Sequence, residues 1–597
     1  MNTPVSHTAR RRTSIAAVVV LIVLIAFVVR LFDIQVVRAQ ELIDDSYKTA
    51  NFVSTDTILG VRGSIVDSEG QVLASSTVRY HVNVDPAVAD DVTRYDEAGE
   101  KYVETWGHLA ERIGDVIGMT GAEVEQVVDD ALAANPDSRY ARVESGITTE
   151  QYRALLELDA PMLTFEQQKS RTYPNGAVAG NLVGFTSTDE EPLAGYELMQ
   201  DACLASTDGS VQYQTSGDRG VRIPGTTVET PATNGGTLQL TIDTDLSWYL
   251  LQMLKEEVEA QRAQAGSIMV VEVETGEVKA AVDYPTLDPN DPQAVDASER
   301  GASVFTRTFE PGSTFKAITT ATVLDQGAAT PLTPVDASGY EEFDNGAAVG
   351  DSYAHGVFHY TLTGAMVDSS NVALSKIGSL VSADTRYDYL TAFGVGEKTS
   401  IDFLGEGTGV LRPSDEWDNQ TYYATTFGQG YTVTMPQVVS AYQTLANGGV
   451  RTPLSIVDSC TAADGTVTSP ALPDEQRVVS EDAADTTVDI LENVANAGSV
   501  SDLIQVPGYR IAAKTGTAQK SDGNGGYKSG VYFTSLVGMA PADDPQYIVM
   551  VSLDEPRRVT SSAATAPAFQ KAMTQVLKTY RVPPSDEPFE PLPQFTD

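Results

Sequence analysis

The chain has 597 residues, enough for about four average domains or fewer large ones, and 42% of them are hydrophobic, as in a folded globular protein. Acidic residues outnumber basic residues by 82 to 39. The formal net charge of −43 argues against nucleic-acid binding and against electrostatic docking on anionic lipid. The two cysteines, Cys203 and Cys460, are too few for a disulfide-rich scaffold or a cysteine-rich zinc site, and whether they pair stays open.

The first predicted element is an apolar helix near the N-terminus. Residues 15–29 form an unbroken apolar run, and positions 10–12 just before it are all arginine. A run of this length also fits the apolar part of a signal sequence, but no small-residue cleavage site follows it. Arginines on this side predict that the N-terminus stays in the cytoplasm. We therefore expect a cytoplasmic tail at residues 1–12, a single-pass membrane anchor at 13–33, and an extracytoplasmic location for the rest.

The exported part divides at residues 217–236, which are rich in Gly, Thr and Pro and are predicted to form a linker. Residues 34–233 before it are mixed in character. Residues 234–582 after it show strand-like and helical patterns, with strands expected both at the beginning and near the end. One large α+β domain, whose sheet joins both ends of the segment, accounts for this order. The last residues, 583–597, are Pro-rich and acidic and are predicted to be disordered.

The histidines offer no familiar catalytic pattern. None of the five lies beside a Gly-x-Ser-x-Gly elbow, and no His-Glu-x-x-His occurs, so a Ser-His-Asp hydrolase and a zinc protease are both disfavoured. His355 and His359 are four residues apart, but no carboxylate partner is evident. We interpret them as ordinary loop histidines and expect no metal site.

A serine can instead be activated by a lysine, and Ser-x-x-Lys occurs once, with Ser313 and Lys316 at its ends. The turn Glu310-Pro311-Gly312 precedes it, and a helix-prone run follows. If Ser313 opens that helix, the two side chains share one face, with the amine over the hydroxyl. The free N–H groups of a helix N-terminus are also suited to an oxyanion.

Two more patterns, each present once, complete an ordered set. Ser369-Ser370-Asn371 begins 56 residues after Ser313, and Lys514-Thr515-Gly516 begins 145 residues further on. The order Ser-x-x-Lys, Ser-x-Asn, Lys-Thr-Gly is that of penicillin-binding proteins and class A β-lactamases. Three coincidences in this order within one domain are improbable.

The chemistry of each residue type suggests its role in catalysis. Lys316 acts as a base only when neutral, and burial beside a second cation lowers a lysine pKa. Ser369 can relay a proton between Lys316 and a leaving amine. Lys514, on an expected strand at residues 510–518, can tune Ser313 and attract a carboxylate.

The remaining motif residues are predicted to bind substrate. Asn371 can hydrogen-bond a substrate amide, and the hydroxyls of Thr515 and Thr517 can bind a carboxylate. Gly516 allows the substrate close to the backbone. The backbone N–H groups of Ser313 and Thr517 would form the oxyanion hole.

With these motifs the sequence resembles the class B penicillin-binding proteins, which are monofunctional peptidoglycan transpeptidases. The resemblance covers roughly residues 20–580 and is weakest at 80–160. Further matching motifs begin at Arg62 (RGSIVD), Arg171 (RTYPNG), Gly195 (GYE), Thr306 (TRTFEPGS), Phe427 (FGQG) and Ala446 (ANGG).

This resemblance implies a membrane-anchored enzyme with an elongated pedestal at residues 34–233 and a transpeptidase domain at 234–582, in which helices flank an antiparallel sheet. Ser313 would attack the penultimate D-Ala of a stem peptide, and the amine of a neighbouring stem would resolve the acyl-enzyme. β-Lactams would acylate the same serine, and no cofactor is implied. No glycosyltransferase signature is found, so the resemblance implies a separate SEDS-type polymerase (FtsW-like), acting on lipid II-derived strands together with divisome proteins.

Several alternatives stay open. Residues 514–519 and 532–541 resemble the septal, FtsI-like branch, and the elongation branch is the runner-up. A D,D-carboxypeptidase or β-lactamase would use Ser313 in the same way and pass the acyl group to water. A penicillin sensor is disfavoured because it usually needs a cytoplasmic output domain and only about a dozen residues precede the expected anchor. A catalytically silent scaffold is disfavoured because all three motifs are intact. The middle motif is Ser-Ser-Asn rather than the Ser-Asp-Asn of many relatives, at a position that varies in the family.

Overall fold

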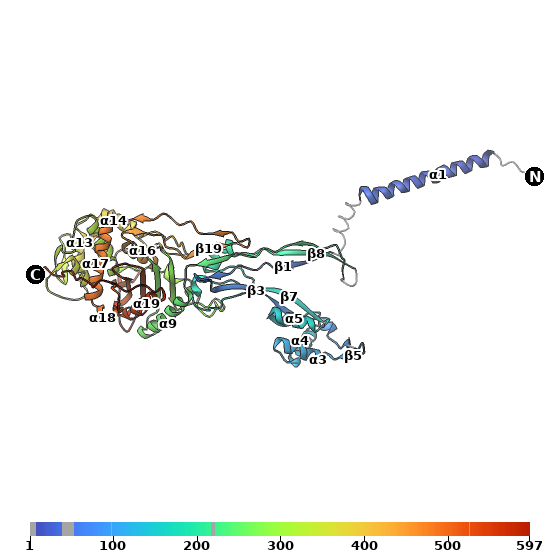
Figure 1. The fold of residues 1–597 in the computed structure, drawn as a ribbon, viewed down its shortest axis with the longest axis horizontal. Helices are drawn as coiled ribbons and strands as arrows, with labels where there is room; N and C mark the ends of the chain where they lie inside the picture. Colours follow the sequence, from blue (N-terminus) through green and yellow to red (C-terminus); the bar gives the residue numbers. More distant parts are fainter. Residues whose placement is uncertain (1–6, 39–52, 97, 217–220, 524–525, 597) are drawn as a thin grey trace, which may run out of the picture. The chain divides into compact units, whose positions relative to one another are not determined.

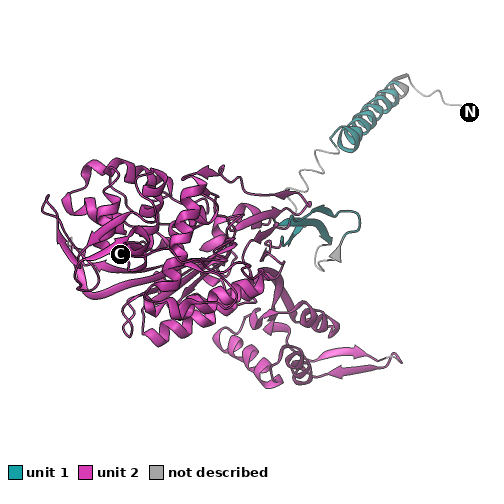
Figure 2. Ribbon diagram, turned by 60° about the vertical axis from the view of Figure 1, so that its left-hand side comes forward, with its two compact units in different colours: residues 1–60, 207–233 teal, residues 61–206, 234–597 magenta. Residues whose placement is uncertain are grey.

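The computed structural model describes residues 7–38, 53–96, 98–216, 221–523 and 526–596 (Figure 1). It contains two compact units, one formed by residues 1–60 and 207–233 and the other by 61–206 and 234–597 (Figure 2). We describe each unit by itself.

The first unit contains the apolar N-terminal helix. Helix α1 (His7–Phe32) continues into a π-helical turn, Asp33–Val37. The segment Arg11–Val37 has a mean hydropathy of 3.1, and within the described residues it is the one helix long and apolar enough to cross a membrane. It contains the predicted anchor at 13–33 and fits a single-pass membrane anchor.

The same unit contains a small antiparallel sheet. Strand β1 (Val53–Ile58) pairs with β8 (Gly209–Ser216) along its whole length, and β8 also pairs with β9 (Val221–Arg222) and β10 (Val228–Thr230). The interpretation of residues 217–236 as a linker was therefore wrong for these two strands. Local composition does not distinguish short strands that pair with β8 from a linker.

In the second unit, a lobe forms around the long strand β3 (Val72–Val84), which pairs with β6 (Ala141–Ile147) and β7 (Leu163–Thr172). Its buried core gathers Val82, Leu109, Ile113, Val124 and Leu155. The lobe includes most of residues 80–160, where the sequence matched no known motif. Its other elements are β4 (Val92–Tyr95), β5 (Lys101–Glu104), α3 (Trp106–Ile117), α4 (Gly121–Ala134) and α5 (Thr149–Glu157).

A larger sheet connects this lobe to the C-terminal part of the unit. Its strands lie in the order β20-β19-β11-β2-β3-β6, with β7 paired to β3. Strands β11 and β2 run parallel, so segments far apart in the chain lie side by side. Its further strands are β2 (Ile65–Val66), β11 (Thr237–Leu240), β19 (Val457–Thr461) and β20 (Val467–Thr468).

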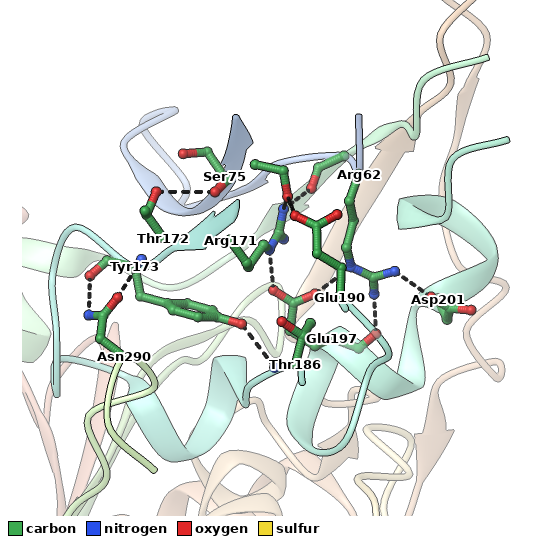
Figure 3. A network of polar contacts seen from close by, with 12 residues as sticks. Arg62, Ser75, Arg171, Thr172, Tyr173, Thr186, Glu190, Glu197, Asp201 and Asn290 are labelled. Atoms are coloured by element: carbon green, nitrogen blue, oxygen red, sulfur yellow. Dashed lines mark hydrogen bonds and ion pairs between the residues drawn. The ribbon is translucent and has the colours of Figure 1, made fainter. Parts of the chain in front are cut away.

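A buried ion-pair network joins the motifs that begin at Arg62, Arg171 and Gly195 (Figure 3). The Glu197 carboxylate accepts hydrogen bonds from Arg62 Nε at 2.8 Å and from Arg171 Nε at 2.7 Å, and its side chain is fully buried. Arg62 also donates to Asp201 at 2.5 Å. The motif at Arg62 is thus joined to two motifs that lie more than a hundred residues further along the chain. Glu197 lies on the short helix α7 (Gly195–Met199) and Asp201 begins α8 (Asp201–Leu204); the short helix α6 (Gly180–Val183) precedes them in the chain.

The catalytic-type motifs lie in an α+β domain built on a five-stranded antiparallel sheet of order β13-β12-β24-β23-β22. The sheet joins strands from both ends of the segment, which confirms the predicted α+β arrangement. Strand β22, which contains the Lys-Thr-Gly motif, is at one edge. The strands are β12 (Ala265–Glu272), β13 (Val278–Tyr284), β22 (Ala512–Ser521), β23 (Tyr527–Ala540) and β24 (Tyr547–Asp554).

Alternate side chains of each strand point to opposite faces of the sheet. Both faces are apolar, and each packs against other elements of the domain. Ile268 and Val270 belong to the core that includes α9 (Thr244–Gln261) and α19 (Ala566–Thr579), whereas Met269 and Val271 belong to the core on the other face. The helices of the domain's remaining part are α10 (Ser303–Thr306), α11 (Lys316–Asp325), α12 (Leu362–Val367), α13 (Asn371–Gly378), α14 (Ala383–Ala392), α15 (Asn419–Ala424), α16 (Met435–Ala446), α17 (Glu481–Ala497) and α18 (Ser501–Ile504).

The two cysteines form a disulfide, which the sequence left open. Cys203 and Cys460 are 257 residues apart in the chain, and their Cα atoms lie 6.1 Å apart. The pairing follows from topology, because Cys460 lies on β19 opposite Leu238 of β11, and Gly236 just before that strand donates its N–H to the Cys203 carbonyl.

The C-terminal segment is ordered against the domain, so the prediction of a disordered tail at 583–597 was wrong for its described residues. The carbonyl of Gln594 accepts the N–H of Thr361 at 3.0 Å, and the N–H of Thr596 donates to the His359 carbonyl at 3.0 Å. The ring of Phe595 stacks on Tyr360 with centroids 5.6 Å apart. The prediction of disorder was based on amino-acid composition, which contains no information about these hydrogen bonds and ring contacts with distant residues.

Candidate active site

Ser313 lies in a cleft of about 870 Å³, on the 3₁₀ turn Gly312–Phe315. Helix α11 begins three residues later, so Ser313 precedes the helix instead of opening it as predicted. Gly312 has a left-handed φ of +56°, and its N–H donates to the Gly428 carbonyl at 2.8 Å. Glycine is suited to this conformation, and the turn directs the half-buried Ser313 toward the cleft.

Lys316 is fully buried and contacts the second motif. Its Nζ donates to the Ser369 carbonyl at 2.5 Å and to the Ser369 hydroxyl at 3.2 Å. Within the described part of the chain, these are the hydrogen bonds made by this amine. The predicted proximity of Lys316 and Ser369 is therefore present, while a Ser313–Lys316 hydrogen bond stays a prediction.

Lys514 approaches the same hydroxyl from strand β22. Its Nζ lies 2.9 Å from the Ser369 Oγ, and its side chain is also buried. Burial lowers the pKa of Lys514 to about 7. Burial and the neighbouring charge of Lys514 hold the pKa of Lys316 well below its usual range, although Asp351 and Asp368 act in the opposite direction. The site therefore favours a neutral amine at Lys316.

Ser369 has a left-handed backbone, with φ of +57°, which is uncommon for a residue other than glycine. It follows α12 and precedes α13. The N–H of Ser370 donates to the Ala365 carbonyl at 3.0 Å, and Lys316 holds the carbonyl of Ser369. Strain of this kind persists where the surroundings fix the backbone, and it is common at active sites.

Asn371 begins helix α13 and lines the cleft. Its Nδ2 donates to the Gly350 carbonyl at 2.9 Å. This bond orients the side-chain amide. Its predicted role in binding a substrate amide stays a prediction.

Strand β22 forms one wall of the cleft. Thr515 and Thr517 line it, and the Thr517 hydroxyl oxygen accepts the N–H of Ser562 at 3.0 Å, which leaves its own proton free to donate. Gly516 does not line the cleft. A Cβ there would lie 2.5 Å from the Ser535 Oγ and 2.9 Å from the Thr314 Cγ2. Gly516 is thus required for packing against β23 and the nucleophile turn, and its role in admitting substrate stays a prediction.

The sequence missed a buried His–Asp pair beside the second motif. His355 Nε2 lies 3.0 Å from the Asp351 carboxylate, and Asp351 in turn accepts the Ser370 hydroxyl at 2.7 Å. His359 likewise contacts Asp336 at 2.7 Å, at an exposed position. Both histidines therefore have carboxylate partners that the sequence did not reveal. Asp351 lies four residues before His355, but this segment is an irregular loop, so no helical pattern indicated the pair.

A second carboxylate, Asp368, accepts hydrogen bonds from the hydroxyls of Tyr353, at 2.7 Å, and Tyr360. Asp351 and Asp368 are the carboxylates among the described residues that line the cleft. Both are held by donors of the chain itself. Gln594 and Phe595 of the C-terminal segment also line the cleft, and no local motif could have indicated them.

The arrangement can carry out acyl transfer. A half-buried serine shares a cleft with a hydroxyl held between two buried amines, which provides a nucleophile, a base of lowered pKa and a proton relay. An edge strand with free hydroxyls provides one wall where an extended peptide can bind.

Two family models match the chain. Residues 266–574 match the penicillin binding protein transpeptidase domain, and residues 57–240 match the penicillin-binding protein dimerisation domain. The chain is similar to penicillin-binding protein PbpB of Mycolicibacterium smegmatis, with 32% identity over 98% of this chain and 93% of that protein.

The peptidoglycan D,D-transpeptidase FtsI of Escherichia coli is 29% identical over 88% of this chain and 84% of that protein. Among solved structures, penicillin binding protein 3 of Mycobacterium tuberculosis, complexed with aztreonam, is similar with a TM-score of 0.68 and 28% identity. That match covers 90% of this chain and all of the solved chain.

Proposed function

The chain belongs to the penicillin-binding proteins, and from this membership and the cleft geometry we propose that it is a class B peptidoglycan D,D-transpeptidase of the septal branch, with Ser313 as nucleophile. One observation carries the proposal. The Ser369 hydroxyl lies between the amines of Lys316 and Lys514, in the cleft that Ser313 lines. The similarity to the FtsI transpeptidase supports the septal assignment over the elongation branch.

Acylation begins at Ser313. Its oxygen bonds to the carbonyl carbon of the penultimate D-Ala of a stem peptide, while its proton passes to the neutral amine of Lys316. Burial and the charge of Lys514 support this role, because both lower the pKa of Lys316. The backbone N–H groups of Ser313 and Thr517 stabilise the oxyanion.

The tetrahedral intermediate then expels the terminal D-Ala. The bond between carbonyl carbon and leaving nitrogen breaks, and the nitrogen takes the proton from Lys316 through the Ser369 hydroxyl. In the second half-reaction, the amine of a neighbouring stem peptide attacks the ester carbonyl. The proton lost by this amine passes through Ser369 to Lys316, and Lys316 donates it to the Ser313 oxygen as the ester bond breaks.

Substrate recognition is assigned to the cleft walls. Lys514 and the hydroxyls of Thr515 and Thr517 bind the terminal carboxylate, and Asn371 binds a peptide amide of the donor. β-Lactams present a similar carboxylate and a strained amide, and acylate Ser313 to an ester that hydrolyses slowly. The aztreonam complex of the Mycobacterium tuberculosis relative supports this reading.

The compartment is inferred from the anchor. Arginines at positions 10–12 before the apolar helix support a cytoplasmic N-terminus and an extracytoplasmic catalytic domain. The Cys203–Cys460 disulfide is consistent with an oxidising extracytoplasmic location. A separate SEDS-type glycosyltransferase, FtsW-like, supplies the lipid II-derived strands, and divisome proteins recruit the enzyme.

A hydrolase of the same fold is less well supported. A β-lactamase needs a carboxylate that activates a deacylating water. Among the described residues the cleft carboxylates are Asp351 and Asp368, and both are engaged by donors from the second motif or from tyrosines.

The proposal is tested with the full-length chain in detergent, incubated with benzylpenicillin and measured by intact mass, with Ser313→Ala as control. We expect a persistent adduct on the wild type and none on the variant. Exchange of the terminal D-Ala of a stem peptide for a labelled D-amino acid then separates a transpeptidase from a sensor. A short-lived adduct with drug turnover would indicate a β-lactamase, and no adduct would refute the proposal.

A further inference from the structure

A single buried carboxylate organises the turn that contains the second motif. Asp351 Oδ1 accepts the N–H of Asn371 at 2.5 Å and of Val372 at 3.0 Å. Its Oδ2 accepts the hydroxyl of Ser370 at 2.7 Å and contacts His355 Nε2 at 3.0 Å. The Asp351 side chain is 3% exposed. One carboxylate therefore occupies the N-terminus of α13 and fixes both residues that follow Ser369.

The neighbouring backbone holds the same turn. The Gly350 carbonyl accepts the side-chain amide of Asn371 at 2.9 Å. Ser369 itself has a φ of +57°, a conformation that costs free energy for a serine. The loop of Gly350 and Asp351 thus fixes the C-terminal side of a strained residue, whose hydroxyl has to stay between two amines.

His355 in turn fixes Asp351. Its Nε2 faces the carboxylate, and its Nδ1 lies 2.7 Å from the Gly356 carbonyl. Both neighbours are acceptors, so only the doubly protonated imidazolium donates to both. The side chain is 4% exposed, and Phe358 stacks on the ring with centroids 4.7 Å apart. An uncharged ring would leave one of these acceptors facing a lone pair of a ring nitrogen.

The charged and titratable groups around this pair are few. Asp351 and Asp368 act electrostatically on His355, and the ring of Tyr353 lies 4.9 Å from its ring. Burial lowers the pKa of His355, but the hydrogen bonds with Asp351 and Gly356 outweigh it, and the net pKa is raised. The negative charge of Asp351 also raises the pKa of Lys316.

We propose that Asp351 and His355 are positioning residues for acylation, in which the imidazolium holds the carboxylate that sets the geometry of Ser369 and Asn371. The contacts of the pair with the second motif are made by Asp351, to the hydroxyl of Ser370 and the N–H of Asn371. The inference rests on the proposed function only in requiring that Ser313 be the acylated residue.

The test compares His355→Gln with wild type, using the full-length chain in detergent. Glutamine retains a donor toward Asp351 but has no charge. The second-order rate constant of acylation by a fluorescent penicillin is measured from pH 5.5 to 9. The matched control is His359→Gln, four residues away, which removes the exposed His359–Asp336 pair.

We expect His355→Gln to acylate about tenfold more slowly than wild type at pH 6, the effect of losing one charged hydrogen bond. The ratio of the wild-type to the variant rate constant should approach one above the raised pKa of His355, because the wild-type imidazole is then also neutral. The rate constants of wild type and variant are compared at each pH. His359→Gln should stay within about twofold of wild type throughout.

A wild-type-to-variant ratio that is the same at every pH, or His355→Gln behaving like the control, would overturn the inference. If thermal melting shows that His355→Gln does not fold, the Ser370→Ala variant is used to test the inference. It removes one donor to Asp351 and leaves the imidazole in place, so it should slow acylation about threefold at all pH values; an unchanged rate overturns the inference. Labelling that persists in Ser313→Ala would instead refute the proposed function.

Discussion

Replacing Lys514 with methionine should make the protein more stable at neutral pH while removing most of its activity. The Lys514 side chain is almost completely buried, and burial lowers its pKa from 10.5 to about 7. At about 1.36 kcal/mol per pKa unit, this difference corresponds to about 5 kcal/mol of destabilisation at pH 7. The lost hydrogen bond to Ser369 offsets about 1 kcal/mol. We therefore expect a net gain of about 4 kcal/mol.

The pH dependence gives the sign of the effect. Between pH 7 and 10.5 the unfolded chain binds a proton at Lys514 that the folded chain does not, so wild-type stability rises with pH across this window. Below about pH 7 both states are protonated, and the burial penalty is complete. The advantage of Lys514→Met should therefore be largest at pH 7 or below and disappear near pH 10.5.

The assay is thermal unfolding of the full-length chain in detergent at pH 7 and pH 10, with a gain of roughly 5–10 °C expected at pH 7. Penicillin acylation should fall roughly a hundredfold, because the charge that lowers the pKa of Lys316 is lost. Lys520→Met is the control on the same strand. Lys520 forms ion pairs with Asp554 at 2.8 Å and Glu555 at 2.9 Å, so its removal should lower stability by up to about 1 kcal/mol. A Lys514→Met protein that melts at or below the wild-type temperature at pH 7 would refute the reasoning.

Three further predictions follow from contacts away from the lysines. Glu197→Gln leaves Arg171 without its buried counter-charge and should cost about 3–5 kcal/mol in guanidinium unfolding; a loss below about 1 kcal/mol would show that the network is not stabilising. Phe595→Ala removes the ring that stacks on Tyr360 at the cleft and should raise KM for a donor peptide about 2- to 10-fold at unchanged melting temperature, whereas an unaltered KM would contradict a role in binding. Cys203→Ser should cost about 2–5 kcal/mol and abolish the effect of reductant on unfolding; a wild type equally stable when reduced would argue against the disulfide.

The sequence predicted the parts of the site that are encoded in short motifs. Ser313 and Lys316 were predicted from lysine activation of a serine, and Ser369 and Lys514 from the ordered motifs. The fold brings the amines of Lys316 and Lys514 to the Ser369 hydroxyl, and the catalytic roles stay proposals. The sheet that joins both ends of the domain could also be predicted, since strand-like patterns occur at both ends. These inferences depend on local pattern and order alone.

What the sequence could not provide depends on contacts between distant segments. The carboxylate that holds the second motif, Asp351, comes from an irregular loop without periodicity. The role of Gly516 depends on Ser535 of the neighbouring strand, which approaches only after the sheet forms. The acidic C-terminal segment has the composition of a disordered chain, yet its backbone pairs with that of His359 and Thr361.

The strongly acidic composition creates a specific difficulty for a lysine-dependent site. Asp351 and Asp368 both favour the protonated form of Lys316, which is the unreactive one. Both carboxylates are present beside the lysine. The chain surrounds Asp351 with His355, Ser370 and backbone N–H groups, and Asp368 with two tyrosine hydroxyls. Donors that share the negative charge weaken its effect on the lysine, so burial and the charge of Lys514 prevail. The carboxylates can then serve to fix the strained turn while Lys316 stays available as a base.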